Sequence, residues 1–159
     1  MRFRAILIVA VLCASLCAVA ATPGSSVKAN ILIVKSHQDI ANWVQLDPAK
    51  RQGDVGRLRT VGRGVKIYLP VVATFSESQV GRTIAYKGYV QIVSPAGNTL
   101  AGMRLFANQV DRRAPATIVL EPVMDVGFDR SDPNGAYKVR ARVTNGNETF
   151  TAEETFRLQ

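Results

Sequence analysis

Residues 129–143, DRSDPNGAYKVRARV, decide the fold of this chain. A polar segment from Asp129 to Gly135 leads into a run that alternates strictly between apolar and basic side chains. Period-two alternation is typical of a β-strand with one buried face. The stretch therefore predicts a strand with an apolar side, Tyr137, Val139, Ala141 and Val143, and a uniformly basic side, Lys138, Arg140 and Arg142.

The surrounding sequence predicts further strands. Residues 83–93 and 99–110 flank a Pro- and Gly-containing turn and predict one hairpin, and the Asn-Gly pair at 145–146 predicts another. Ser36, with Asp39 three residues on, is a capping box, so a single helical turn competes with a strand over 37–46. No segment after the N-terminal leader has three amphipathic helical turns. About seven to nine strands are expected, as in an all-β sandwich or barrel.

The last predicted strand carries its apolar residues with one interruption. At Glu153 and Glu154 the alternation slips, and we expect a β-bulge there to restore the register. The apolar members of this strand are Phe150, Ala152, Phe156 and Leu158.

The N-terminus has the features of a secretory signal peptide. Arg2 and Arg4 precede about a dozen apolar residues, and small residues before position 22 fit a cleavage site. We expect residues 1–21 to be removed, 22–30 to form a flexible tether and 31–159 to form one domain. Cys13 and Cys17 would leave with the leader, so no disulfide is expected. The prediction is a secreted or periplasmic protein with no stable membrane insertion after cleavage.

The charge balance favours an acidic partner. The whole chain has a net charge of +8, and removal of Arg2 and Arg4 with the leader leaves +6. A basic protein attracts acidic proteins, anionic surfaces or nucleic acid. Nucleic acid is not expected, because the basic positions lack interleaved aromatic residues for base stacking and the leader directs the chain out of the cytoplasm.

The opening stretch also resembles a known family. Phe128, the run from Asp132 to Tyr137 and the alternation up to Val143 are similar to the late hairpin of immunoglobulin-like sandwich domains of secreted bacterial proteins. Residues 90–97 resemble an earlier hairpin of such domains. The resemblance covers about residues 65–158, and the Cys-Trp-Cys pattern of antibody domains is absent. It implies an immunoglobulin-like antiparallel β-sandwich, a fold that binds, scaffolds or inhibits and rarely catalyses.

The sequence contains few residues suited to catalysis or metal binding. Without its leader the chain has no cysteine, and its one histidine, His37, is expected on a solvated loop. No GxSxG or phosphate-binding loop occurs. Residues 129–135 suggest a calcium loop, but Arg130, Pro133 and Arg140 occupy positions that oppose calcium binding, so a type I turn over Asp132–Gly135 is expected instead. We predict no enzyme, no cofactor and no metal.

The basic stripe is the candidate binding site. Lys138, Arg140 and Arg142 would repel one another on one strand face, so an acidic cross-strand neighbour would help. Glu153 in the last strand could neutralise one of the three at most. The alternative is a solvated outer face that protects an edge from aggregation. Four aromatic residues either line a ligand site or pack in the core: Trp43, Tyr68, Tyr86 and Tyr89.

These observations predict a non-catalytic binding protein. Its partner would be another envelope or secreted protein, acidic in character, toward which it acts as an accessory, chaperone-like or inhibitor protein. One alternative is a structural subunit of a surface or secretion assembly, in which exposed strands pair between subunits. An envelope hydrolase is the other alternative, and it has the least support from the residues.

Overall fold

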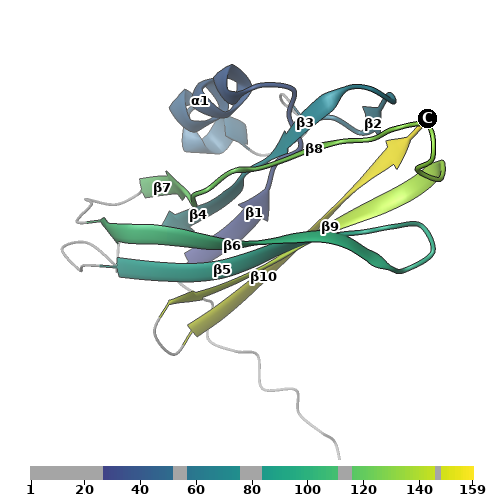
Figure 1. Ribbon diagram of the computed structural model, residues 1–159. Coiled ribbons are helices and arrows are strands. Elements are labelled where there is room, and N and C mark those ends of the chain that lie inside the picture. The colour runs from purple at the N-terminus through teal and green to yellow at the C-terminus, as the bar shows by residue number, and fades with distance from the viewer. Residues whose placement is uncertain (1–26, 52–56, 76–83, 111–115, 146–147) are drawn as a thin grey trace, which may run out of the picture.

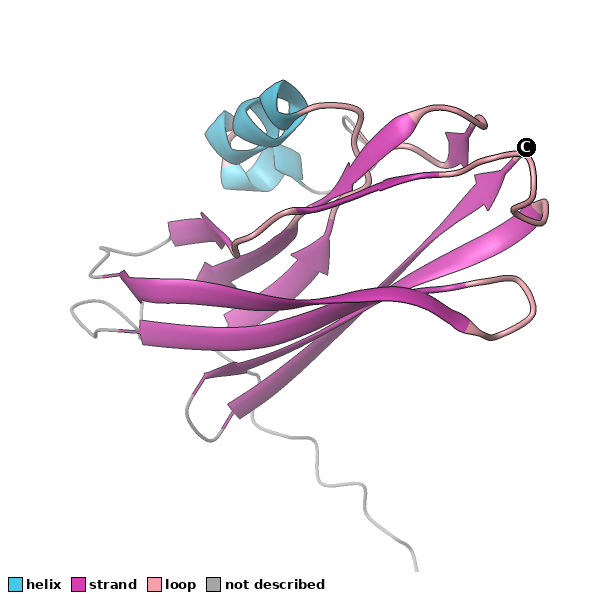
Figure 2. Cartoon of the chain, viewed as in Figure 1, coloured by secondary structure: helices cyan, strands magenta, loops and turns pink. Residues whose placement is uncertain are grey.

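The computed structural model describes residues 27–51, 57–75, 84–110, 116–145 and 148–159. Strands dominate, with one short helix and one 3₁₀ turn (Figures 1 and 2). In chain order the elements are β1 (Val27–Ile31), α1 (His37–Gln45), η1 (Pro48–Arg51), β2 (Thr60–Val61), β3 (Lys66–Leu69), β4 (Val71–Phe75), β5 (Ile84–Val93), β6 (Thr99–Val110), β7 (Ala116–Val119), β8 (Met124–Gly127), β9 (Gly135–Asn145) and β10 (Glu148–Leu158). The predicted leader, residues 1–21, lies outside the described residues.

The strands form two facing layers. One layer is a five-stranded sheet of order β2-β10-β9-β5-β6. The other consists of the sheet β1-β4-β7 and the pair β3-β8, joined end to end because β4 follows β3 directly after Pro70 (Figure 1). All pairings are antiparallel except that of β2 with β10. The β9–β10 hairpin lies beside β5, with β6 outside, which is the arrangement of an immunoglobulin-like sandwich. The predicted fold is confirmed.

The residues of the deciding stretch fill the space between the layers. The ring of Tyr137 stacks on that of Phe156 at 5.4 Å, and the edge of Phe128 meets Tyr137 at 5.0 Å. The Tyr137 hydroxyl donates to the Pro133 carbonyl oxygen at 2.8 Å. A tyrosine at the start of this strand that bonds to the backbone just upstream is the tyrosine corner of immunoglobulin-like domains. Packing and hydrogen bonding thus join the preceding loop to the core.

Residues 31–34 and 71–73 of the smaller layer are buried on both sides. Ile31 and Ile33 point into the main core, whereas Leu32 and Val34 point outward into a second cluster with Val72. This cluster is covered by Ile40 and Trp43 of α1. Because neither face of these strands meets water, the sequence there is continuously apolar instead of alternating.

The start of the domain differs from the prediction in two places. Strand β1 begins at Val27 and pairs with β4, so residues 27–30 belong to the sheet and not to the tether. Of the two alternatives for residues 37–46, the structure contains the short helix. Ser36 caps α1, and both hydrogen bonds of the predicted capping box with Asp39 are present. His37 is the first residue of this helix rather than part of a loop, and its ring lies 4.5 Å from that of Tyr68.

The bulge predicted at Glu153 and Glu154 is absent. The register of β10 with β9 runs without a shift from Glu148 to Leu158. Glu154 therefore occupies an inward-facing position, where a half-buried ion pair with Arg57 at 2.8 Å compensates its charge. Arg59 lies 3.5 Å from the other carboxylate oxygen. Glu154 is thus an ion-pair partner on the inner face, and its polarity does not indicate an extra residue in the strand.

The polar loop before β9 forms a turn, but three residues earlier than predicted. The turn is centred on Arg130 and Ser131. The backbone N–H of Ser131 donates to Asp129 at 2.7 Å, and that of Asp129 donates to Asp132 at 2.8 Å. The hydrogen bond from the Ser131 hydroxyl lowers the pKa of Asp129 below its ordinary value. Both carboxylates therefore serve the turn itself.

Candidate functional site: the basic face of the five-stranded sheet

The predicted stripe lies on the outer face of the five-stranded sheet. Within β9, Val139, Ala141 and Val143 are buried, whereas the side chains of Lys138, Arg140 and Arg142 are exposed. β10 pairs with one side of β9 and β5 with the other. Because β9 is central in its sheet, the stripe does not protect an edge, and that interpretation of its charges is wrong.

Glu153 neutralises more of the stripe than predicted. It lies directly opposite Arg140, which it contacts at 2.7 Å, and diagonally from Lys138, whose Nζ is 3.5 Å away. The hydrogen bond from Arg140, and then the charge of Lys138, lower the pKa of Glu153 below its ordinary value. One carboxylate thus serves two cations, because diagonal neighbours on a sheet lie within reach of long side chains.

The sequence reasoning missed the part of the face that comes from β5 and β6. Tyr89 of β5 lies opposite Arg142 on one side and Arg104 of β6 on the other. Lys87, two residues before Tyr89, faces the same way. The alternation along β5 and β6 could have assigned these side chains to one face, but only the strand order places that face beside the stripe.

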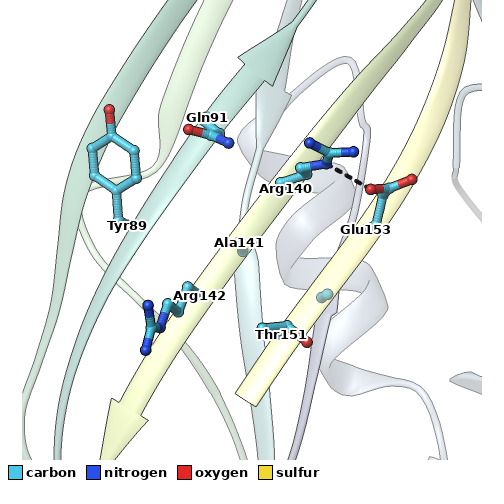
Figure 3. A pocket seen from close by; sticks show the side chains of 8 residues that line it. Tyr89, Gln91, Arg140, Ala141, Arg142, Thr151 and Glu153 are labelled. Atoms are coloured by element: carbon cyan, nitrogen blue, oxygen red, sulfur yellow. Dashed lines mark hydrogen bonds and ion pairs between the residues drawn. The ribbon is translucent and has the colours of Figure 1, made fainter. Parts of the chain in front are cut away.

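A shallow depression of about 640 Å³ lies on this face (Figure 3). In the figure the Arg140–Glu153 pair closes one side, and Tyr89 and Gln91 stand across from it on the neighbouring strand. The lining combines guanidinium, carboxylate, amide and hydroxyl groups with one aromatic ring and two alanines, so it offers both polar and apolar surface to a ligand. Its residues are Tyr89, Gln91, Arg140, Ala141, Arg142, Thr151, Ala152 and Glu153.

Tyr89 extends from this depression over the neighbouring strand. A Cβ atom at Gly102 of β6 would lie only 1.8 Å from the Tyr89 hydroxyl oxygen, so the ring occupies the space that a side chain there would need. The tyrosine remains 43% exposed. Of the four aromatic residues predicted to line a site or pack inside, Trp43 and Tyr86 are buried, Tyr68 is half-buried and Tyr89 alone presents its side chain on the basic face.

Charge on the face is unbalanced around Tyr89. Within the described ranges, the side chains of Lys87, Arg104 and Arg142 have no ion pair and no hydrogen bond. Glu153 is already engaged by Arg140 and Lys138. The free cations therefore attract anionic groups from outside the chain.

Groups for other chemistry are dispersed. Across the part of the chain that the structure describes, no three His, Cys, Asp or Glu residues are placed to hold a metal ion. Two acidic residues before β9 are engaged in other contacts: Asp125 forms an ion pair with Lys66 at 2.6 Å, and Asp129 serves the turn. No helix in the described ranges has the length and apolarity needed to cross a bilayer.

Comparison with known proteins yields structural likenesses only. No family model matches the chain, and no curated protein matches it in sequence. The CARDB domain of a Pyrococcus furiosus protein, solved in complex with di-metal ions, is 11% identical with a TM-score of 0.44, over 84% of this chain and 87% of that one. An immunoglobulin-like protein of Pseudomonas aeruginosa is 15% identical with a TM-score of 0.38, over 87% and 100%.

A third likeness is to the sporulation control protein Spo0M of Bacillus subtilis. It is 7% identical with a TM-score of 0.44, and the match covers 84% of this chain but 49% of that one. At these identities the functional assignment depends on the chain's own residues, and the fold assignment depends on its strand order and tyrosine corner.

Proposed function

We propose that this chain is a secreted or periplasmic, non-catalytic binding protein that recognises an acidic protein of the envelope or extracellular space. In this role it acts as an accessory, chaperone-like or inhibitor protein. The observation that carries the proposal is the uncovered outer face of the five-stranded sheet. There Lys87, Arg104 and Arg142 surround an exposed tyrosine without acidic partners among the described residues.

The chemistry of the face supports a protein partner with carboxylates. Arginine presents several donors in one plane and binds a carboxylate through two parallel hydrogen bonds. Tyrosine offers a rigid, amphipathic contact surface and is enriched where proteins meet. Arg142 and Arg104 flank Tyr89 in one cross-strand row, so acidic side chains would meet both donor groups beside an aromatic contact.

The test is affinity capture from the secreted and envelope fractions of the native cell at several salt concentrations. Replacing Lys138, Arg140 and Arg142 by Gln should remove most of the captured partner and flatten the salt dependence, because attraction between exposed charges is screened by salt. The matched control replaces Lys35, Lys50 and Arg130 by Gln, which removes the same charge from exposed positions outside this face.

The control should retain capture, and both variants should unfold within about 0.5 kcal/mol of the unmodified protein, as surface substitutions usually do. Unchanged capture with unchanged salt dependence in the stripe variant would remove Lys138, Arg140 and Arg142 from the proposed function. Recovery of the partner with an altered mass would contradict a non-catalytic role.

A further inference from the structure

The outer edge of β6 has open backbone hydrogen-bonding positions. β6 is the last strand of its sheet. On its outer side Phe106 donates to the Glu121 carbonyl oxygen at 2.6 Å and accepts from the Glu121 N–H at 2.9 Å. Peptide groups alternate in direction along an antiparallel strand, so Gly102 and Arg104 point the same way as Phe106, whereas a register shift against β5 interrupts the alternation at Leu100. Among the described residues, no backbone group pairs with the outward groups of Gly102 and Arg104.

The side chains along this edge differ on its two faces. On the outer face, Arg104 lies beside Tyr89. On the inner face, Ala101 and Met103 pack against the main core but are only partly buried. A strand added at this edge would place alternate side chains next to the basic face and the others over Ala101 and Met103.

We propose that the edge of β6 at Gly102 and Arg104 binds an extended segment of the acidic partner as an additional antiparallel strand. This inference rests on the proposed function and assigns the partner segment a pattern of alternating acidic and apolar side chains. The acidic side chains lie beside Arg104 and Tyr89, and the apolar side chains cover Met103. Main-chain hydrogen bonds supply affinity, and the alternating side chains supply specificity.

A second copy of this chain fits the edge less well than an acidic strand does. Pairing two β6 edges would join two basic faces into one continuous sheet, with Arg104 and Arg142 of each copy on the same side. Like charges on one sheet face destabilise the pairing. An acidic strand has the complementary charge.

The experiment uses the isotope-labelled mature protein and a capped heptapeptide of alternating glutamate and valine, followed by NMR. In antiparallel addition, the glutamates lie opposite Gly102 and Arg104 and direct their N–H groups toward β6, while the valines direct theirs away. One peptide therefore carries N-methyl groups on its glutamates, and a matched control carries them on its valines.

The unmethylated peptide should slow hydrogen exchange of the Gly102 and Arg104 amides about tenfold when nine tenths of the protein is occupied. Exchange at Ala101 and Met103, whose amides already face β5, should stay unchanged. Methylation of the glutamates should weaken binding at least about tenfold, because several hydrogen bonds are lost. Methylation of the valines should leave the affinity within about twofold of that of the unmethylated peptide.

Equal affinities of the two methylated peptides, or weaker binding of the valine-methylated one, would overturn antiparallel strand addition. Protection of the Gly102 and Arg104 amides in the protein alone, together with a dimer in sedimentation, would also overturn it and assign the edge to a second copy. The proposed function fails separately, if the Gln variant of the stripe binds the unmethylated peptide as tightly as the unmodified protein at every salt concentration. If binding depends on salt but N-methylation does not change the affinity, the peptide binds the basic face and the proposed role of the β6 edge is wrong.

Discussion

The two outer faces of this sandwich differ in what covers them. The outer face of the smaller layer carries Leu32, Val34 and Val72 and lies beneath α1. The outer face of the five-stranded sheet is bare and carries most of the cations of β5, β6 and β9. A sheet with two apolar faces needs a cover, whereas a sheet with one apolar face leaves the other available to a partner. The comparison therefore assigns stability to one face and recognition to the other.

The difference between the two faces follows from local sequence patterns. Residues 31–34 and 71–73 are continuously apolar, and the structure buries both of their sides. β9 alternates, and the structure buries one side. Arg51 shows that charge alone does not mark a binding face. It lies on the covered side, where it bonds to the carbonyl oxygens of Val44 and Leu46 and to the Thr117 hydroxyl, and it lies 5.7 Å from the centre of the Trp43 ring.

The largest expected effect comes from opening the covered face. Trp43 is 4% exposed and fills the space between α1 and the smaller layer. Replacing Trp43 by Ala should lower the free energy of unfolding by about 3–5 kcal/mol, the usual cost of removing a large buried side chain. Denaturant-induced unfolding measures this change in the free energy of unfolding. Gln45→Ala, at an exposed position of the same helix, is the control, and a loss below about 1 kcal/mol for the Trp43 variant would contradict the role of α1 as a cover.

A smaller effect is expected at Arg51. Arg51→Met keeps much of the side-chain length but leaves the last carbonyl groups of α1 and the Thr117 hydroxyl without their donor. Hydrogen bonds to a charged group contribute about 1.5–3 kcal/mol, and a loss of that order is expected in the same unfolding measurement. Lys50→Met removes a neighbouring exposed charge and should change little. Equal losses of unfolding free energy in both variants would show that the hydrogen bonds of Arg51 contribute no more to stability than an exposed, solvated charge does.

The smallest effect is expected on the bare face and depends on pH. The pKa of Glu153 is lowered by Arg140, so the carboxylate contributes stability that is present above the unfolded-state pKa of about 4.3 and is lost as the pH falls through the lower folded-state value. Because the pair is exposed, this contribution should be slight. An NMR titration of Glu153 should show a midpoint below that of an ordinary glutamate. In Arg140→Gln the midpoint should rise, and an unshifted midpoint would mean that the pair does not form in solution.

Much of the fold could be predicted because its signals are local. The alternation from Tyr137 to Val143, the turn pairs of the two hairpins and the capping box at Ser36 each depend on a few neighbouring residues. The predicted bulge was wrong because the deciding contact is not local. Glu154 is polar by itself, and only the nearby Arg57, almost a hundred positions earlier in the chain, makes it compatible with the inner face.

The candidate site could be predicted only in part. The stripe of Lys138, Arg140 and Arg142 follows from one strand, and its exposure is confirmed. That Glu153 reaches two of its cations depends on the register between β9 and β10. That Lys87, Tyr89 and Arg104 belong to the same face depends on strand order, which results from pairings between distant segments.

The sequence by itself determined that the chain forms strands, which sides of β9 are apolar and basic, and that a helix capped by Ser36 competes with a strand, because backbone preference and side-chain alternation act over a few residues. Only the tertiary structure decided which charges share a face. It also placed α1 over the smaller layer and left the five-stranded sheet open, with β6 at its edge. Strand order and register arise from contacts between segments far apart in the chain, and no local pattern encodes which distant partner each strand will meet.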